Sequence, residues 1–170
     1  MTLSFPAYSF VPGYWPHPTR DPDGHSFKHQ EKPAIALQPH AWKACPDYLR
    51  GIELFEHGYY WEAHEAWEGV WLALGRKGDV ALLLKALIKL AAVGVKVRQQ
   101  APRAAQSLLA QVQGHLNTLQ AALPPGPYAG LNLGELSHCL GLLAKKIDAI
   151  ESAPQVPVQK VLPEGLLTLK

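Results

Sequence analysis

The chain has 170 residues, of which 48% are hydrophobic and 18% charged, with a formal net charge of +2 and an isoelectric point near 8.5. This length corresponds to one ordinary domain with its own core. Two cysteines, Cys45 and Cys139, are too few for a disulfide framework and are expected to be small buried hydrophobic residues. The first residues carry neither a basic leader nor an unbroken apolar stretch, so a cytoplasmic protein is expected.

The charge pattern disfavours two classes of partner. The small net charge is not that of a nucleic-acid-binding protein, which carries a clustered basic face. Residues 80–97 are long enough to cross a membrane, but they contain Lys85, Lys89 and Lys96, and lysines are costly in lipid. We therefore expect no nucleic-acid partner, no membrane partner and a helix buried in protein. The sequence leaves the oligomeric state open.

Residues 1–45 are predicted to form a proline-rich arm. Seven prolines fall within the first forty residues, a density that excludes a continuous helix and disfavours a sheet. The stretch Asp21-Pro22-Asp23-Gly24 has the residue preferences of a type I turn. Aromatic residues are too frequent for a disordered tail, so the arm is expected to pack on the domain; they are Phe5, Tyr8, Phe10, Tyr14, Trp15 and Phe27.

From Pro46 onward the hydrophobic periodicity becomes helical and predicts a bundle domain over residues 46–152. The predicted helices end or begin at residues with known capping preferences: the first ends at Gly58, the second spans about 60–74, the third follows Asp79 and spans about 80–98, the fourth opens at Pro102, and the fifth runs from Asn132 to about Ser152. The tail, residues 153–170, is interrupted by prolines and is expected to be extended. The expected fold is therefore all-α, an up-and-down bundle of about five helices with an ordered arm.

The second predicted helix carries acids on one side and core residues on the other. Because a helix turns about 100° per residue, Glu62, Glu65 and Glu68 share one broad sector, with His64 beside them. The third predicted helix carries a narrow line of lysines on an otherwise aliphatic surface. The two charged stripes belong to helices joined by a short link, so the helices are expected to pack antiparallel.

This antiparallel arrangement predicts which charges meet. In two antiparallel helices, residues at the same height have numbers with a constant sum. The sum is 153 for Glu68 and Lys85 and 154 for Glu65 and Lys89, so both pairs fit one register. Three interpretations stay open: a solvated charged face, a half-buried Glu–Lys ladder that fixes the register, and a working site. The predicted polar cluster consists of Glu62, His64, Glu65, Glu68, Lys85 and Lys89.

The stretch His64-Glu65-Ala66-Trp67-Glu68 spells H-E-x-x-E, one letter from a zinc-peptidase motif. Residues at i and i+4 project side by side, so His64 and Glu68 could bind one metal ion, with Glu65 as a water-activating base. A catalytic zinc site needs a third protein ligand, and His57 is separated from the helix by Gly58. The nearby lysines also oppose a cation. Two interpretations of His64 therefore stay open: it is a ligand of a divalent metal cofactor, or it has a purely structural role.

A second polar cluster lies in the arm. His17, Asp21 and His25 are loop residues of types that bind metal ions or contribute to a cleft, with Asp23 and His29 close by in the sequence. Turn chemistry alone also explains the two aspartates. We treat this cluster as a secondary candidate site.

The letters from Phe55 to Trp71, FEHGYYWEAHEAWEGVW, followed by LLLKALIKLAA at 82–92, resemble a bacterial and archaeal family called domain of unknown function 309. The family pattern is F-x-x-G-x-[YF]-x-E-A-H-E-x-x-E-x-x-W, and the likeness covers roughly residues 47–120. The arm from Pro16 to Ser26 is also similar to the opening of a longer subgroup. The resemblance implies a small helical bundle and places Glu62, His64, Glu65 and Glu68 in the family's polar cluster, without implying an activity.

The third predicted helix departs from the family pattern in two ways. Lys85 and Lys89 stand where many relatives carry glutamine, and Ala86 stands where they carry glycine. A pocket at this place is therefore expected to be more cationic in this chain.

Two functional hypotheses result. The first is a non-catalytic binding or scaffold module, in which the polar cluster fixes the helix register or binds a small anionic ligand through Lys85 and Lys89. The second is a metal-dependent hydrolase that uses His64 and Glu68 as ligands and Glu65 as base. Five tryptophans are expected to supply hydrophobic walls for the site: Trp15, Trp42, Trp61, Trp67 and Trp71.

Overall fold

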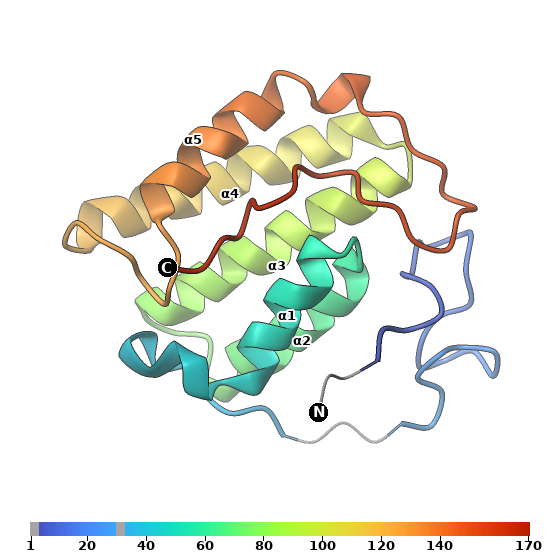
Figure 1. Ribbon diagram of the computed structural model, residues 1–170, viewed down its shortest axis with the longest axis horizontal. Helices are drawn as coiled ribbons and strands as arrows, with labels where there is room; N and C mark the ends of the chain where they lie inside the picture. Colours follow the sequence, from blue (N-terminus) through green and yellow to red (C-terminus); the bar gives the residue numbers. More distant parts are fainter. Residues whose placement is uncertain (1–3, 30–32) are drawn as a thin grey trace.

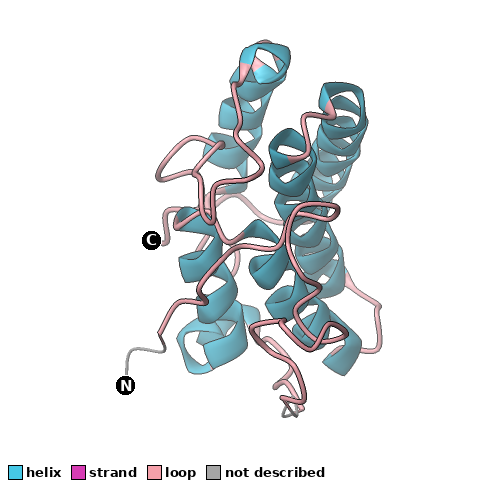
Figure 2. Ribbon diagram, turned by 90° about the vertical axis from the view of Figure 1, so that its right-hand side faces the viewer, coloured by secondary structure: helices cyan, strands magenta, loops and turns pink. Residues whose placement is uncertain are grey.

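A computed structural model describes residues 4–29 and 33–170, and within these ranges the protein is a bundle of helices without a β-strand (Figures 1 and 2). The α-helices are α1 (Pro46–Glu56), α2 (Tyr60–Ala73), α3 (Asp79–Arg98), α4 (Pro102–Ala122) and α5 (Leu133–Ala144). Two short 3-10 helices, η1 (Pro39–Ala44) and η2 (Ile147–Ala149), precede and follow them. The predicted all-α bundle with an ordered arm is confirmed.

Most helix ends follow the predicted capping residues. Pro46 and Pro102 occupy the first turns of α1 and α4, and Gly58 has a φ of +85° just beyond α1. The Asn132 side chain accepts hydrogen bonds from the backbone nitrogens of Gly134 and Glu135, at 3.1 Å each. Asp79 is the first residue of α3 rather than its cap, and Gly78 holds the cap position.

The fifth helix is shorter than predicted. It ends at Ala144 instead of continuing to about Ser152, and the 3-10 helix η2 follows. The turn buries Ile147 and brings the chain back to the end of α3, where the Ser152 hydroxyl donates to the backbone oxygen of Val97 at 2.8 Å. Hydrophobic residues after Ala144 therefore reach the core through this turn and not on the face of a longer helix.

α3 is the central helix of the core, packed between α2 and α4. Its buried residues are mostly leucine, alanine and valine, and Leu83, Leu84, Leu87 and Leu90 are fully buried. At Gly94 a Cβ atom would lie 2.4 Å from the ring of Tyr60, so the two helices approach too closely there for any side chain. Tyr60 and Gly94 are level in the register predicted from the sequence, and this contact holds α2 and α3 in that register.

The arm and the tail pack on the bundle and on each other. The Trp15 indole donates to the backbone oxygen of Pro154 at 3.0 Å, and the nitrogen of Ser9 donates to Pro157 O at 2.8 Å. The buried Arg98 guanidinium donates to the oxygen of Val156 at 2.6 Å. In Figure 1 the tail, drawn in red, then passes over α3 toward the loop before α5, and Lys170 N donates to Gly130 O at 2.8 Å.

The expectation for one of the two cysteines is wrong. Cys45 is buried as predicted, but Cys139 is exposed because it lies on the outer side of α5, next to the buried Leu140. As expected, no continuous helix forms in the described part of the first forty residues; η1 begins only at Pro39, since proline is tolerated in a first turn. In the part of the chain that the structure describes, no helix has the length and apolar character needed to cross a membrane.

Candidate functional site

A pocket lies in the seam between α2 and α3. It has a volume of about 290 Å³ and is lined by His64 and Glu68 from α2 and by Lys85 and Lys89 from α3. Its apolar part is supplied by Trp71, Ile88 and Ala92. The antiparallel register explains this grouping, because His64 lies level with Lys89 and Glu68 lies level with Lys85.

The predicted Glu–Lys ladder is not formed. Within residues 4–29 and 33–170, neither Lys85 nor Lys89 makes an ion pair with Glu65 or Glu68. The Lys89 ammonium instead donates to the side-chain oxygen of Gln111 on α4, at 2.7 Å. Lys85 is exposed, so water competes with any carboxylate for its ammonium group. The two lysines therefore face the pocket without carboxylate partners.

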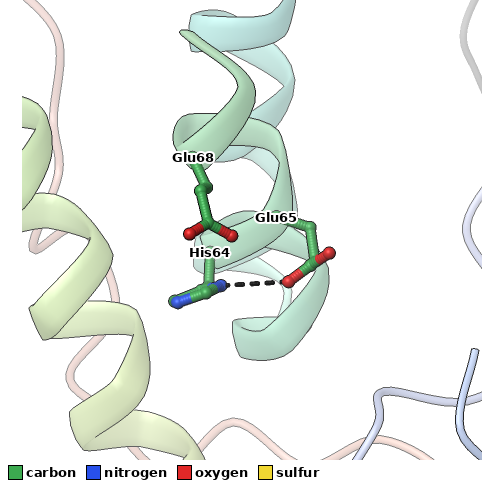
Figure 3. Close-up of side chains that lie close together, drawn as sticks. All are labelled: His64, Glu65 and Glu68. Carbon is green, nitrogen blue, oxygen red and sulfur yellow. Dashed lines mark hydrogen bonds and ion pairs between the residues drawn. The ribbon is translucent and has the colours of Figure 1, made fainter. Parts of the chain in front are cut away.

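His64, Glu65 and Glu68 offer ligand atoms that all lie within 4.8 Å of one another (Figure 3). The His64 Nδ1 atom lies 3.2 Å from Glu65 Oε1, and Glu68 stands one turn further along the same side of α2. Imidazole and carboxylate groups at this spacing can hold a divalent cation. His57 is not part of this group, and its Nδ1 atom lies within hydrogen-bond distance of the backbone oxygen of Glu53, at 2.8 Å.

Glu62 is placed apart from the other acids of the predicted cluster. Its side chain is only 8% exposed and faces the arm. Its carboxylate accepts hydrogen bonds from the backbone nitrogen of Phe10 at 2.9 Å and from the hydroxyl of Ser9 at 3.1 Å. The Nε2 atom of His25 lies 3.0 Å from the same carboxylate. Glu62 thus fastens the arm to the start of α2.

The secondary candidate residues hold the fold of the arm. His25 bridges Glu62 and Ser26, whose hydroxyl lies 2.9 Å from Nδ1. The Nδ1 atom of His17 accepts from the backbone nitrogens of Thr19 and Arg20 at 3.3 and 3.4 Å. Asp21 accepts from its neighbour Asp23 N at 3.0 Å, as expected in a turn. The structure therefore brings His25 to Glu62 but joins neither His17 nor Asp21 to a group of three potential metal ligands within the described ranges.

A row of rings connects the arm with the pocket. The ring of Trp61 lies 5.9 Å from the ring of His17 and 5.6 Å from the ring of His64, where the two rings are stacked. Trp61 is half-buried and also contacts Phe10 at 4.8 Å, edge to face. The position of the His64 imidazole therefore depends on how the arm packs against Trp61.

Among the five predicted wall residues, Trp71 alone lines the pocket directly. Trp67 is fully buried and donates to the backbone oxygen of Tyr48 at 3.2 Å. Trp15 packs with the arm and the tail, and Trp42 packs over Gly130, where a Cβ atom would lie 2.7 Å from the indole. Tryptophan was a poor guide to the pocket because its size suits any buried seam of this bundle.

Sequence reasoning missed the contribution of α4. Gln111 binds Lys89, and the pKa of His115, one turn further on, is lowered from its ordinary value by burial of the ring and by the positive charges of Lys85 and Lys89. α3 and α4 are also antiparallel neighbours, so the constant-sum rule applied to them would have placed Lys89 level with Gln111 and Lys85 level with His115.

Fold and site together define a small helical-bundle protein with a polar pocket between its second and third α-helices. Residues 48–108 match the family model of a domain of unknown function (DUF309), which confirms the resemblance identified from the sequence. The matched stretch contains Glu62 and all four polar residues of the pocket, whereas Gln111 and His115 lie beyond it. Searches of curated proteins and of solved structures gave no significant match.

Proposed function

We propose that this protein is a cytoplasmic, non-catalytic binding module whose ligand is a small anion held by Lys85 and Lys89. The observation that carries the proposal is the position of the two ammonium groups, which line one pocket without a carboxylate partner among the described residues. A scaffold role for these charges is less well supported, because the ladder that would fix the register is absent. We propose neither nucleic acid nor a membrane as a partner.

The lining of the pocket indicates the chemistry of the ligand. The lining contains two positive charges, those of the lysines, and one negative charge, that of Glu68, so it favours a negatively charged group on the ligand. Trp71, Ile88 and Ala92 offer an apolar surface beside it. Glu68 can accept a hydrogen bond from a hydroxyl or amino group on the ligand. A small organic acid with an apolar portion and one such donor satisfies all three features.

The size of the pocket limits the ligand. A volume of about 290 Å³ lies just below the roughly 300–1,000 Å³ found for small-molecule sites. A nucleotide or a peptide would extend out of such a pocket. We therefore expect a metabolite of a few carbon atoms.

Thermal unfolding in the presence of phosphate and of small hydroxy, amino and keto acids tests the proposal. A ligand present at ten times its Kd adds about 1.4 kcal/mol to the free energy of unfolding, which raises Tm measurably. Lys89→Ala and Lys85→Ala should each abolish the stabilisation. Lys96→Ala is the matched control, because Lys96 is on the same helix but donates to Gln99 at 2.8 Å and does not line the pocket.

The control decides between specific and general electrostatic binding. If Lys96→Ala reduces the stabilisation as much as Lys89→Ala, the anion responds to overall charge and the pocket has no special role. A panel in which no anion changes Tm contradicts the proposal outright.

The alternative function is a metal-dependent hydrolase, which is favoured by the convergence of His64, Glu65 and Glu68 within 4.8 Å. In this alternative His64 and Glu68 bind the ion and Glu65 activates water. Protein purified without a histidine tag should then contain stoichiometric metal that is lost in His64→Ala. Metal-free native protein that also fails to bind added Zn²⁺ would exclude this function.

A further inference from the structure

The lysines of the pocket are flanked on their second side by α4. Gln111 Oε1 accepts from Lys89 at 2.7 Å, and this contact fixes the level of α4 relative to α3. One turn away on each helix, Lys85 and His115 come level in the same register. Two rows of polar side chains thus cross the three helices: Glu68, Lys85 and His115 in one, and His64, Lys89 and Gln111 in the other.

His115 has an unused ring nitrogen. Its Nε2 atom is buried and has no hydrogen-bond partner within the described ranges, although the ring lies in a polar row. The charged groups acting on the ring are the ammonium groups of Lys85 and Lys89 from α3. Across these lysines, α2 contributes the titratable groups His64 and Glu68. The protonation of a histidine that has two cations on one side and an unpaired ring nitrogen should respond to a change in that local charge.

Without an anion, the surroundings of His115 favour its neutral form. Burial of the ring is the larger cause of the lowered pKa, and the charges of Lys85 and Lys89 lower it further. An anion seated between the lysines opposes this second effect, because its negative charge compensates their field at the ring. Binding of the anion and protonation of His115 therefore favour each other by linkage.

We propose that the pocket binds a doubly charged anion, such as a phosphate or sulfate group, together with one proton that His115 takes up from solvent. This inference rests on the proposed function and narrows its ligand. The charges of Lys85, Lys89 and Glu68 add up to +1. A protonated His115 raises this sum to +2, which neutralises a doubly charged anion. A monoanion needs no such proton.

Sulfate is the appropriate probe because its charge stays constant between pH 5.5 and 8. The experiment follows the Cε1–H resonance of His115 by NMR across this pH range, with and without saturating sulfate, at constant ionic strength. Sulfate should raise the pKa of His115 by about one pH unit, the size of a typical single-charge effect. By linkage, a shift of one unit makes sulfate bind up to about tenfold more tightly at the acidic end of the range.

Two variants assign the effect to one histidine. His115→Gln should bind sulfate with an affinity that no longer strengthens toward low pH through this group, whereas His138→Gln, on the exposed side of α5, should behave like the wild type. If His115→Gln does not fold, the resonance of His115 in the wild-type protein still decides the question.

The outcomes separate this inference from the proposed function. Sulfate that binds without changing the pKa of His115 overturns the proton uptake and leaves anion binding intact. A monocarboxylate that binds through Lys89 while sulfate does not overturns the doubly charged ligand only. Absence of binding by sulfate and by every anion of the panel overturns both.

Discussion

Glu62→Ala should release the arm from the bundle. The substitution removes the acceptor for Phe10 N, for the Ser9 hydroxyl and for His25 in the tautomer whose Nε2 carries the proton. Ser9 is 1% exposed and the His25 side chain 10% exposed, so water does not easily replace the lost acceptor while the arm stays in place. Each buried donor left without a partner costs about 1–3 kcal/mol.

The total cost is limited by the arm itself. Once unpaired donors make the packed arm unfavourable, the arm can detach and expose them to water, so we expect a loss of about 2–5 kcal/mol rather than the full sum. This is a large part of the roughly 5–15 kcal/mol by which a domain of this kind is stable. Glu62→Gln, which keeps one carbonyl acceptor, should lose less.

Two measurements test the consequence. Urea unfolding gives the change in free energy, and hydrogen exchange of peptides covering residues 8–26 shows whether protection is lost in the arm before the helices open. Glu65→Ala is the control, because Glu65 is exposed on the same helix and contacts only His64 among the polar side chains of the described residues. Unchanged protection of the arm in Glu62→Ala, with a loss below about 0.5 kcal/mol, would refute the assignment of Glu62 as the anchor of the arm.

Three further predictions concern packing, pH and thiol reactivity. Gly94→Ala places a Cβ atom 2.4 Å from the Tyr60 ring and should destabilise the protein by about 1–3 kcal/mol in urea unfolding, whereas Gly114→Ala, with no atom within 4 Å, should be neutral or stabilise by up to about 1 kcal/mol. The pKa of His115 is lower in the folded than in the unfolded protein, so the unfolded state binds more protons and stability falls as the pH drops below about 6.5. His115→Gln should therefore lose less stability than the wild type between pH 7.5 and 5.5, and an equal loss would contradict the assignment. Cys139 is exposed and Cys45 is buried with a raised pKa, so a thiol reagent should label one cysteine in the native protein and two in urea, and rapid native labelling of Cys45 would be inconsistent with its burial.

The parts of the structure that followed from the sequence are those governed by local periodicity and capping. The pattern of α2 and α3 gave their register, which the contact between Tyr60 and Gly94 bears out, and Asn132 marked the start of α5. The end of α5 could not be predicted, because the apolar pattern continues to Ile147 after the helix ends, and Ile147 is buried by a turn. Cys139 was misjudged for a related reason: its burial depends on which side of α5 meets α4.

The candidate site was only partly predictable, because a long side chain can choose among partners on several helices, and a helical wheel of one helix does not represent those partners. Lys89 lies level with acids on α2, but it donates to Gln111 on α4, which sequence reasoning did not consider. Glu62 shares a helix sector with Glu65 and Glu68, but the arm, which has no periodicity, supplies three donors to it. Contacts of this kind depend on segments distant in the sequence, and periodicity carries no information about them.

The lysines of α3 are difficult to explain as a device for stability. Lys85 and Lys89 stand at i and i+4, a spacing at which like charges destabilise a helix by about 0.2–0.5 kcal/mol. Neither gains an ion pair within the described ranges in compensation, and their charges also lower the pKa of His115. Neutral residues at these two positions would avoid the repulsion between the ammonium groups. Unfavourable charges gathered at one place in a fold are typical of a functional site, and an anion is the ligand that would relieve them.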